Sequence, residues 1–97
     1  MLARVITSQG KPEQLEAVLR YFRENVGPAA RKMTGFKGAY FLVDRKSGRT
    51  LGMALWDTEE HLQASAQMTA QLGVGMAQAA GATKPPAVEI YEVAVQL

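Results

Sequence analysis

The chain lacks cysteine and contains a single histidine, His61. Without thiols it can form neither a disulfide nor a thiolate metal site, and it has no thiol nucleophile. Zinc-finger, heavy-metal-carrier and cysteine-protease functions are therefore excluded. A metal site or a Ser-His-Asp triad would depend on His61 alone for its imidazole. We therefore expect a protein that uses no metal and no cofactor.

Long apolar runs and a strong charge of one sign are also missing. No run approaches the ~20 apolar residues of a membrane span, and the first residues lack the basic region, longer apolar region and cleavage site of a signal peptide. We expect a cytoplasmic protein that does not bind membranes. The net charge of +2 is too small to indicate a nucleic-acid partner, although the pI is about 9.2.

The composition and length predict one globular domain over residues 1–97. The hydrophobic share is 47% and the charged share is 21%, which are ordinary values for a folded protein. A chain of 97 residues could not fill a second hydrophobic core. The candidate elements must therefore pack around one core.

Strand and helix signals alternate along the chain. Apolar and β-branched runs predict strands, while apolar residues at i, i+3, i+4 and i+7 predict helices. Gly27-Pro28 should bend or break the first helix once, and Asp57 with Glu60 resembles a capping box at the start of the second. The predicted elements are a strand over 2–7, a helix from 12, strands over 36–43 and 50–56, a helix from 57 to near 81, and a strand over 88–97.

This β-α-β-β-α-β order predicts a ferredoxin-like α+β fold. Right-handed crossovers place both helices on one face of an antiparallel sheet, which leaves the other face bare. The second predicted strand is apolar on both faces, because Tyr40 and Leu42 alternate with Phe41 and Val43. A second copy of the sheet is the simplest cover for the bare face, so we expect a homodimer.

An RNA-recognition domain shares this order of elements. It would need a basic, glycine and aromatic run on its third strand. The run that comes nearest, residues 37–42, lies on the second predicted strand instead. The sequence therefore does not favour nucleic-acid binding.

Two segments resemble a known family. They are Gly35-Phe36-Lys37-Gly38 after the first helix, and the run from Leu55 through Trp56-Asp57 to Leu62 that leads into the second helix. With them the whole chain is similar to the dimeric α+β barrel superfamily, and within it to antibiotic biosynthesis monooxygenase-like domains. The resemblance implies a homodimeric barrel whose sheets face each other, with a pocket between each sheet and its own helices.

The resemblance leaves three functions open. The leading hypothesis is a small-molecule pocket protein that acts as a cofactor-independent monooxygenase on quinol or aromatic polyketide-like substrates. The alternative is a non-catalytic ligand-binding or regulatory homodimer. A haem-degrading monooxygenase is favoured least: such relatives carry a histidine about nine or ten residues after the tryptophan, where this chain has Ser65 and Ala66.

Three residues are candidates for contact with substrate or for proton transfer. Trp56 could stack on a small aromatic ligand, although a tryptophan that ends an apolar strand is often a core residue. His61 could act as a general base, or it could be a surface residue of the helix. Arg4 could hold an anionic enolate or phenolate, but Glu89 or Glu92 on the last strand could instead pair with it.

Two tyrosines complete the set of predicted site residues. Tyr40 and Tyr91 could each present a phenolic hydroxyl to a ligand oxygen. Packing at an interface would explain both side chains equally well.

Overall fold

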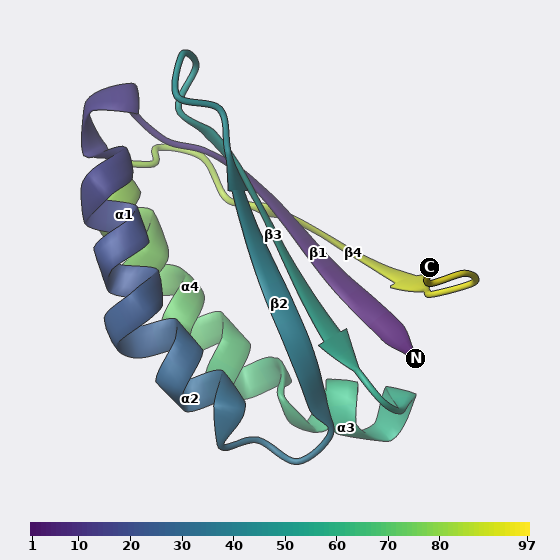
Figure 1. Ribbon diagram of the computed structural model, residues 1–97. Helices are drawn as coiled ribbons and strands as arrows, with labels where there is room; N and C mark the ends of the chain where they lie inside the picture. Colours follow the sequence, from purple (N-terminus) through teal and green to yellow (C-terminus); the bar gives the residue numbers. More distant parts are fainter.

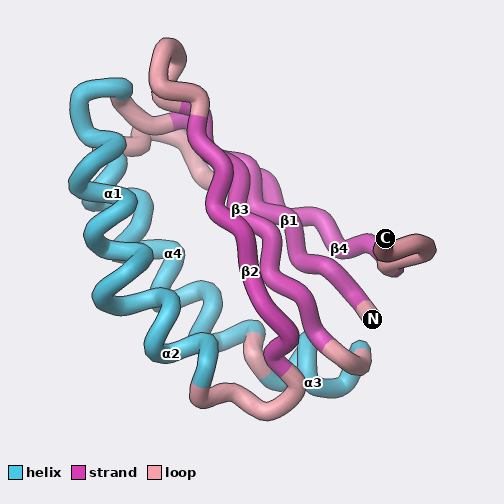
Figure 2. The backbone as a smooth tube through the Cα atoms, viewed as in Figure 1, coloured by secondary structure: helices cyan, strands magenta, loops and turns pink.

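The computed structural model describes residues 1–97 as a four-stranded antiparallel sheet with its helices on one face (Figures 1 and 2). The strands are β1 Leu2–Gln9, β2 Phe36–Val43, β3 Arg49–Trp56 and β4 Ala87–Glu92, in the spatial order β2-β3-β1-β4. The first and last strands are therefore neighbours. This arrangement confirms the predicted ferredoxin-like α+β fold.

The first helical segment remains helical through Gly27-Pro28. It consists of η1 Pro12–Gln14, α1 Leu15–Tyr21, η2 Phe22–Val26 and α2 Gly27–Arg31, of which η2 is a π-helix. The predicted bend or break is thus a change of helix type. Pro28 lies in the first turn of α2, where its missing N–H is tolerated, and the wider π turn directly before it takes up the change in hydrogen bonding.

The second helical segment is divided into α3 Glu59–Ala64 and α4 Ala66–Ala80. The prediction of one unbroken helix from Asp57 was wrong, because Ser65 interrupts it. The Ser65 hydroxyl donates to the carbonyl of Leu62 at 2.7 Å, and such local side-chain bonds compete with the helical pattern.

The two ends of this segment follow familiar capping chemistry. Thr58 is the N-cap, and its Oγ1 accepts from the backbone N–H of His61 at 3.2 Å. The cap lies one residue later than the Asp57 cap that the sequence predicted. Gly81 ends α4 in the left-handed conformation, at φ +65°, which matches the predicted stop.

The last strand is shorter than predicted. β4 ends at Glu92, and the backbone N–H of Val93 then donates to the carbonyl of Met1 at 2.9 Å. Beyond that bond the chain turns back near the N-terminus (Figure 1). The apolar residues that suggested a strand to residue 97 include Val95, which is exposed.

The core lies between the helices and one face of the sheet. Val18 and Leu62 are almost fully buried from the helical side, and Phe22 stacks on Phe41 of β2 with ring centroids 4.9 Å apart. The opposite face of the sheet carries exposed Tyr40 and Leu42 and has no helix over it (Figure 2). None of the helices has the length and hydropathy of a membrane span.

Candidate functional site

A cavity of about 420 Å³ lies between the helices and the sheet. This volume falls within the range of small-molecule sites. Most of its lining is hydrophobic: the sheet contributes Ile6, Phe41 and Trp56, and the helices contribute Phe22 and Met76 among others. The cavity therefore suits a ligand that is largely apolar.

Trp56 lines this cavity from the end of β3. Its side chain is 2% exposed and meets the ring of Phe36 edge to face, with centroids 5.6 Å apart. The indole Nε1–H has no hydrogen-bond partner. An unsatisfied buried donor costs about 1–3 kcal/mol. The Nε1 atom itself has almost no accessible surface, so a ligand oxygen would meet it only after neighbouring side chains shift.

Arg4 also lines the cavity, and its side chain is 5% exposed. Nη1 donates to Ser65 Oγ at 2.9 Å and to Thr69 Oγ1 at 2.7 Å, while Nη2 donates to the carbonyl of Leu62 at 2.9 Å. All three partners are neutral. Burial lowers the pKa of the Arg4 guanidinium below its ordinary value, but an arginine remains protonated at neutral pH.

The expected pairing of Arg4 with Glu89 or Glu92 was wrong. The register of β1 and β4 sets Arg4 opposite Ile90. Glu89 is opposite Val5 and so projects from the other face of the sheet, because successive side chains alternate. Glu92 is two residues further along, and neither carboxylate forms a hydrogen bond or ion pair with Arg4.

The charged side chains of the cavity are all cationic. Arg4 and the exposed Arg31 are among the lining residues, which include no aspartate, glutamate or histidine. The two ion pairs of the structure, Arg45 with Glu16 and His61 with Asp57, lie outside the lining. The electrostatic character of the cavity therefore favours a ligand with negative charge.

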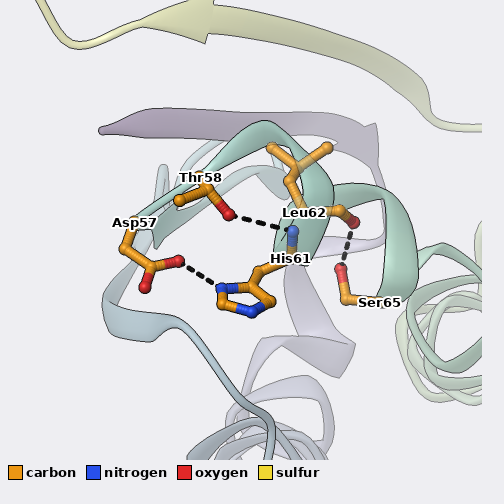
Figure 3. A network of polar contacts seen from close by, with 5 residues as sticks. All are labelled: Asp57, Thr58, His61, Leu62 and Ser65. Atoms are coloured by element: carbon orange, nitrogen blue, oxygen red, sulfur yellow. Dashed lines mark hydrogen bonds and ion pairs between the residues drawn. The ribbon is translucent and has the colours of Figure 1, made fainter.

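His61 lies in the first turn of α3, outside the cavity lining. Its Nδ1 contacts Asp57 Oδ1 at 2.7 Å (Figure 3), and both side chains are about one-third exposed. The hydrogen bond to His61 lowers the pKa of Asp57 below its ordinary value. His61 does not line the cavity that Arg4 and Trp56 share, and its role as a base stays a prediction.

The two tyrosines project from the bare face of the sheet. Tyr40 adjoins Phe41, which packs under the helices, so the Tyr40 ring points the opposite way and is 64% exposed, although the residue borders the cavity. Tyr91 pairs with Ala3 and is outside the lining. Its hydroxyl donates to Glu89 at 2.8 Å, which raises the pKa of Tyr91. Neither phenol is placed to reach a ligand held by Trp56.

Two hydroxyl residues that hold Arg4 were missed by the sequence analysis. Ser65 and Thr69 are four residues apart, which sets their hydroxyls on the same side of the helical segment. A lone arginine within an apolar strand is the available signal for such a pair, because its donors need partners under the helices. The lone arginine shows that its N–H donors need hydrogen-bond acceptors, but it does not identify the helical residues that supply them.

The fold and the cavity together define a ferredoxin-like α+β protein with a ligand-sized apolar site between its helices and its sheet. The sequence belongs to the antibiotic biosynthesis monooxygenase family, whose model matches residues 1–73. The matched segment includes β1, β3 and most of the cavity walls, Arg4 and Trp56 among them.

Curated relatives have no assigned function. An uncharacterized protein of Mycobacterium tuberculosis, Rv2557, is 36% identical over 92 residues, which cover 95% of this chain. A second one from the same organism, Rv2558, is 33% identical over 70 residues, or 72% of this chain. The alignments span only 40% and 30% of the lengths of these relatives.

Solved structures share the fold at low sequence identity. A monooxygenase from the gene ActVA-Orf6 of Streptomyces coelicolor, in complex with nanaomycin D, superposes with a TM-score of 0.81 at 16% identity, covering 99% of this chain and 89% of that one. A protein of unknown function from Nitrosomonas europaea superposes with a TM-score of 0.71 at 24% identity, covering 99% and 92%. These likenesses show the fold.

Proposed function

We propose that the chain is a cofactor-independent monooxygenase that acts on quinol or aromatic polyketide-like substrates in the cavity beneath its helices. The observation that carries the proposal is the largely apolar cavity of about 420 Å³, which Trp56 and the buried Arg4 line together. Membership of the antibiotic biosynthesis monooxygenase family supports it. The nanaomycin D complex of a monooxygenase with this fold supports the aromatic class of substrate.

In the proposed reaction the substrate supplies all the electrons. An activated CH₂ group next to an electron-rich ring loses a proton, and the resulting carbanion or enolate reduces O₂. One oxygen atom remains on that carbon as a carbonyl and the other leaves as water. The four-electron oxidation of CH₂ to C=O thus balances the four-electron reduction of O₂.

The protein's contribution to this reaction is electrostatic. The cation of Arg4 favours the anion over the neutral substrate. In the proposal a small shift of the side chains around Trp56 lets its unpartnered Nε1–H donate to the oxygen on which the enolate charge develops. A dry apolar wall strengthens both interactions. Since the cavity lining includes no carboxylate or imidazole, this stabilisation lowers the substrate's own pKa, and solvent outside the cavity accepts the proton.

Oxygen uptake by metal-free protein over a panel of anthrones and dihydroquinones tests the proposal. We expect turnover by the unaltered protein and a loss of about 10- to 100-fold in Trp56→Phe, because one donor to the developing oxyanion is removed. The His61→Ala variant tests the predicted base, and on the geometry it should retain turnover. Uptake that is equal in Trp56→Phe and the unaltered protein would place the chemistry elsewhere.

A non-catalytic ligand-binding protein is the second candidate function. The missing base in the cavity lining favours it. Trp56 is the sole tryptophan, so its fluorescence reports directly on occupancy of the cavity. Saturable quenching by an anthrone without oxygen uptake would support this alternative. Haem degradation gains no support, because His61 does not line the cavity.

We further propose that the protein acts as a homodimer whose bare sheet faces meet. Tyr40, Leu42 and Tyr91 on that face are 64%, 52% and 51% exposed. Exposed apolar side chains gathered on one sheet face are typical of a protein interface. The tyrosines then pack between the sheets and do not contact the substrate.

A further inference from the structure

The cavity presents hydrogen-bond donors that have no protein acceptor. Arg4 has five N–H donors and uses three of them, leaving Nε–H and one Nη2–H. The Trp56 Nε1–H is unpartnered. Thr69 accepts from Arg4, and its own hydroxyl hydrogen donates to no protein acceptor. A ligand that satisfies this set must bring acceptors.

The charge of Arg4 is also uncompensated. The residue is 5% exposed, and each protein group that its guanidinium contacts is neutral. A buried charge without a counter-ion is costly, whereas one paired with an anion in good geometry is far less so. The free protein therefore retains a positive charge that a bound anion would neutralise.

Arg4 and Trp56 lie close enough to share one ligand. In the β1–β3 register Arg4 is opposite Ala54, and Trp56 is two residues further along β3 on the same face. Diagonal neighbours of this kind are about 7–8 Å apart. Both side chains line the same cavity, so one ring system is large enough to lie against both.

We infer that the cavity selects substrates whose aromatic system carries a carboxylate, held by Arg4, while Trp56 remains free for the reacting oxygen. The inference rests on the proposed function for the reacting oxygen. A carboxylate fits better than a phenol as the partner of Arg4, because it is ionised at neutral pH and needs no base, and the cavity lining offers none. It also accepts two N–H bonds from one guanidinium.

Binding of two matched probes tests this inference without any change to the protein. Naphthalene-2-carboxylate and naphthalene-2-carboxamide have the same ring and nearly the same size, but only the first is charged. Calorimetric titration of the unaltered protein should give an affinity for the carboxylate about 10- to 100-fold higher, as expected of charge-assisted bonds. Equal affinities, or no binding of either probe, would overturn the inference.

Arginine variants locate the source of the preference. Arg4→Gln should reduce the carboxylate-to-carboxamide ratio to near one, and Arg4→Lys should restore part of it, because the lysine keeps the charge. Arg45→Gln is the matched control: it removes an arginine that is exposed and paired with Glu16, so the ratio should not change. A ratio that survives in folded Arg4→Gln would assign the selectivity to another group.

The same probes separate this inference from the proposed function. Carboxylate preference without oxygen uptake on any anthrone or quinol would leave an anion-binding protein, so the inference would stand and the monooxygenase proposal would fail. If the protein takes up oxygen on neutral substrates and shows no carboxylate preference, the monooxygenase proposal would stand and this inference would fail.

Discussion

Ser65 links the interruption between helices α3 and α4 to the candidate site. Its hydroxyl donates to the Leu62 carbonyl at 2.7 Å and accepts from Arg4 at 2.9 Å. The residue is 1% exposed, so no water can replace these bonds. The local interruption of the helix thus creates the acceptors that hold a buried cation against the cavity.

Removal of this hydroxyl should destabilise the protein. In Ser65→Ala the Arg4 donor and the Leu62 carbonyl each lose a partner, so the free energy of unfolding should fall by about 1–3 kcal/mol. Urea denaturation measures the change. Gln71→Ala, an exposed substitution on α4, serves as the control and should leave stability unchanged or slightly raised. If Ser65→Ala leaves the free energy of unfolding unchanged, the buried position of Arg4 does not depend on this contact.

The Asp57–His61 pair should make the free energy of unfolding fall at low pH. The hydrogen bond from His61 lowers the pKa of Asp57 in the folded state, so its stabilising effect is full above the unfolded pKa of about 4 and is lost as pH falls through the lower folded value. Asp57→Asn should therefore lose less stability than the unaltered protein on acidification, measured by urea midpoints. Glu60→Gln is the control, because it removes a carboxylate of α3 that forms no ion pair. Its loss of stability on acidification should equal that of the unaltered protein.

At the scale of elements, α4 packs tightly against α1 at one position and leaves open space beside the cavity at another. Gly75 of α4 faces Tyr21 at the end of α1 so closely that an added Cβ would overlap the phenol ring, whereas a Cβ at Gly73 would meet nothing within 4 Å. Gly73 also lines the cavity. Two glycines of one helix thus serve different purposes: one allows contact between helices, and the other leaves space for a ligand.

The two glycines should respond in opposite directions to alanine. Alanine is favoured over glycine in a helix by up to about 1 kcal/mol, so Gly73→Ala should raise the thermal midpoint. Gly75→Ala should lower it, because Tyr21 must move. Thermal unfolding followed by circular dichroism measures both. Stabilisation by both substitutions would contradict the close packing of α1 against α4.

The sequence predicted the elements better than their interruptions. Apolar and β-branched runs located all four strands, including β4, which is exposed along its whole length. The same patterns could not foresee the break at Ser65, which depends on a hydroxyl that bonds both Leu62 and the distant Arg4. They also extended the last strand past Glu92, because apolar alternation does not reveal whether a neighbouring strand is present.

The candidate site was predicted only in part, because residue types are visible in the sequence and strand register is not. Arg4 and Trp56 were recognised because a charge and a large aromatic ring are conspicuous in short strands, and both line the cavity. Which side of the sheet each residue faces depends on the register, and this placed Tyr91 on the bare face and left Arg4 without a carboxylate partner. Tertiary register cannot be read from residue types.

At the scale of the whole molecule, the two faces of the sheet have separate tasks. The helices and one face enclose the cavity, and the other face carries Tyr40, Leu42 and Tyr91 with no helix to cover it (Figure 2). Because the cavity lies within one chain, a second copy could cover the bare face without blocking the ligand.

Light scattering should find twice the chain mass of 10.5 kDa. Leu42→Glu places a charge in the middle of the proposed sheet interface and should shift the protein toward monomer, because an unpaired charge cannot be buried cheaply. Val74→Glu changes a similarly exposed apolar residue on α4 and should leave the mass unchanged. A monomeric unaltered protein would refute the homodimer.

Product analysis after turnover under ¹⁸O₂ tests the central claim most directly. If the cavity supports cofactor-independent monooxygenation, the carbonyl product of an anthrone should contain a single ¹⁸O atom by mass spectrometry, with the second atom in water. Trp56→Phe should form the same labelled product more slowly. Product that takes its new oxygen from water, or that forms equally fast without the protein, would contradict the account.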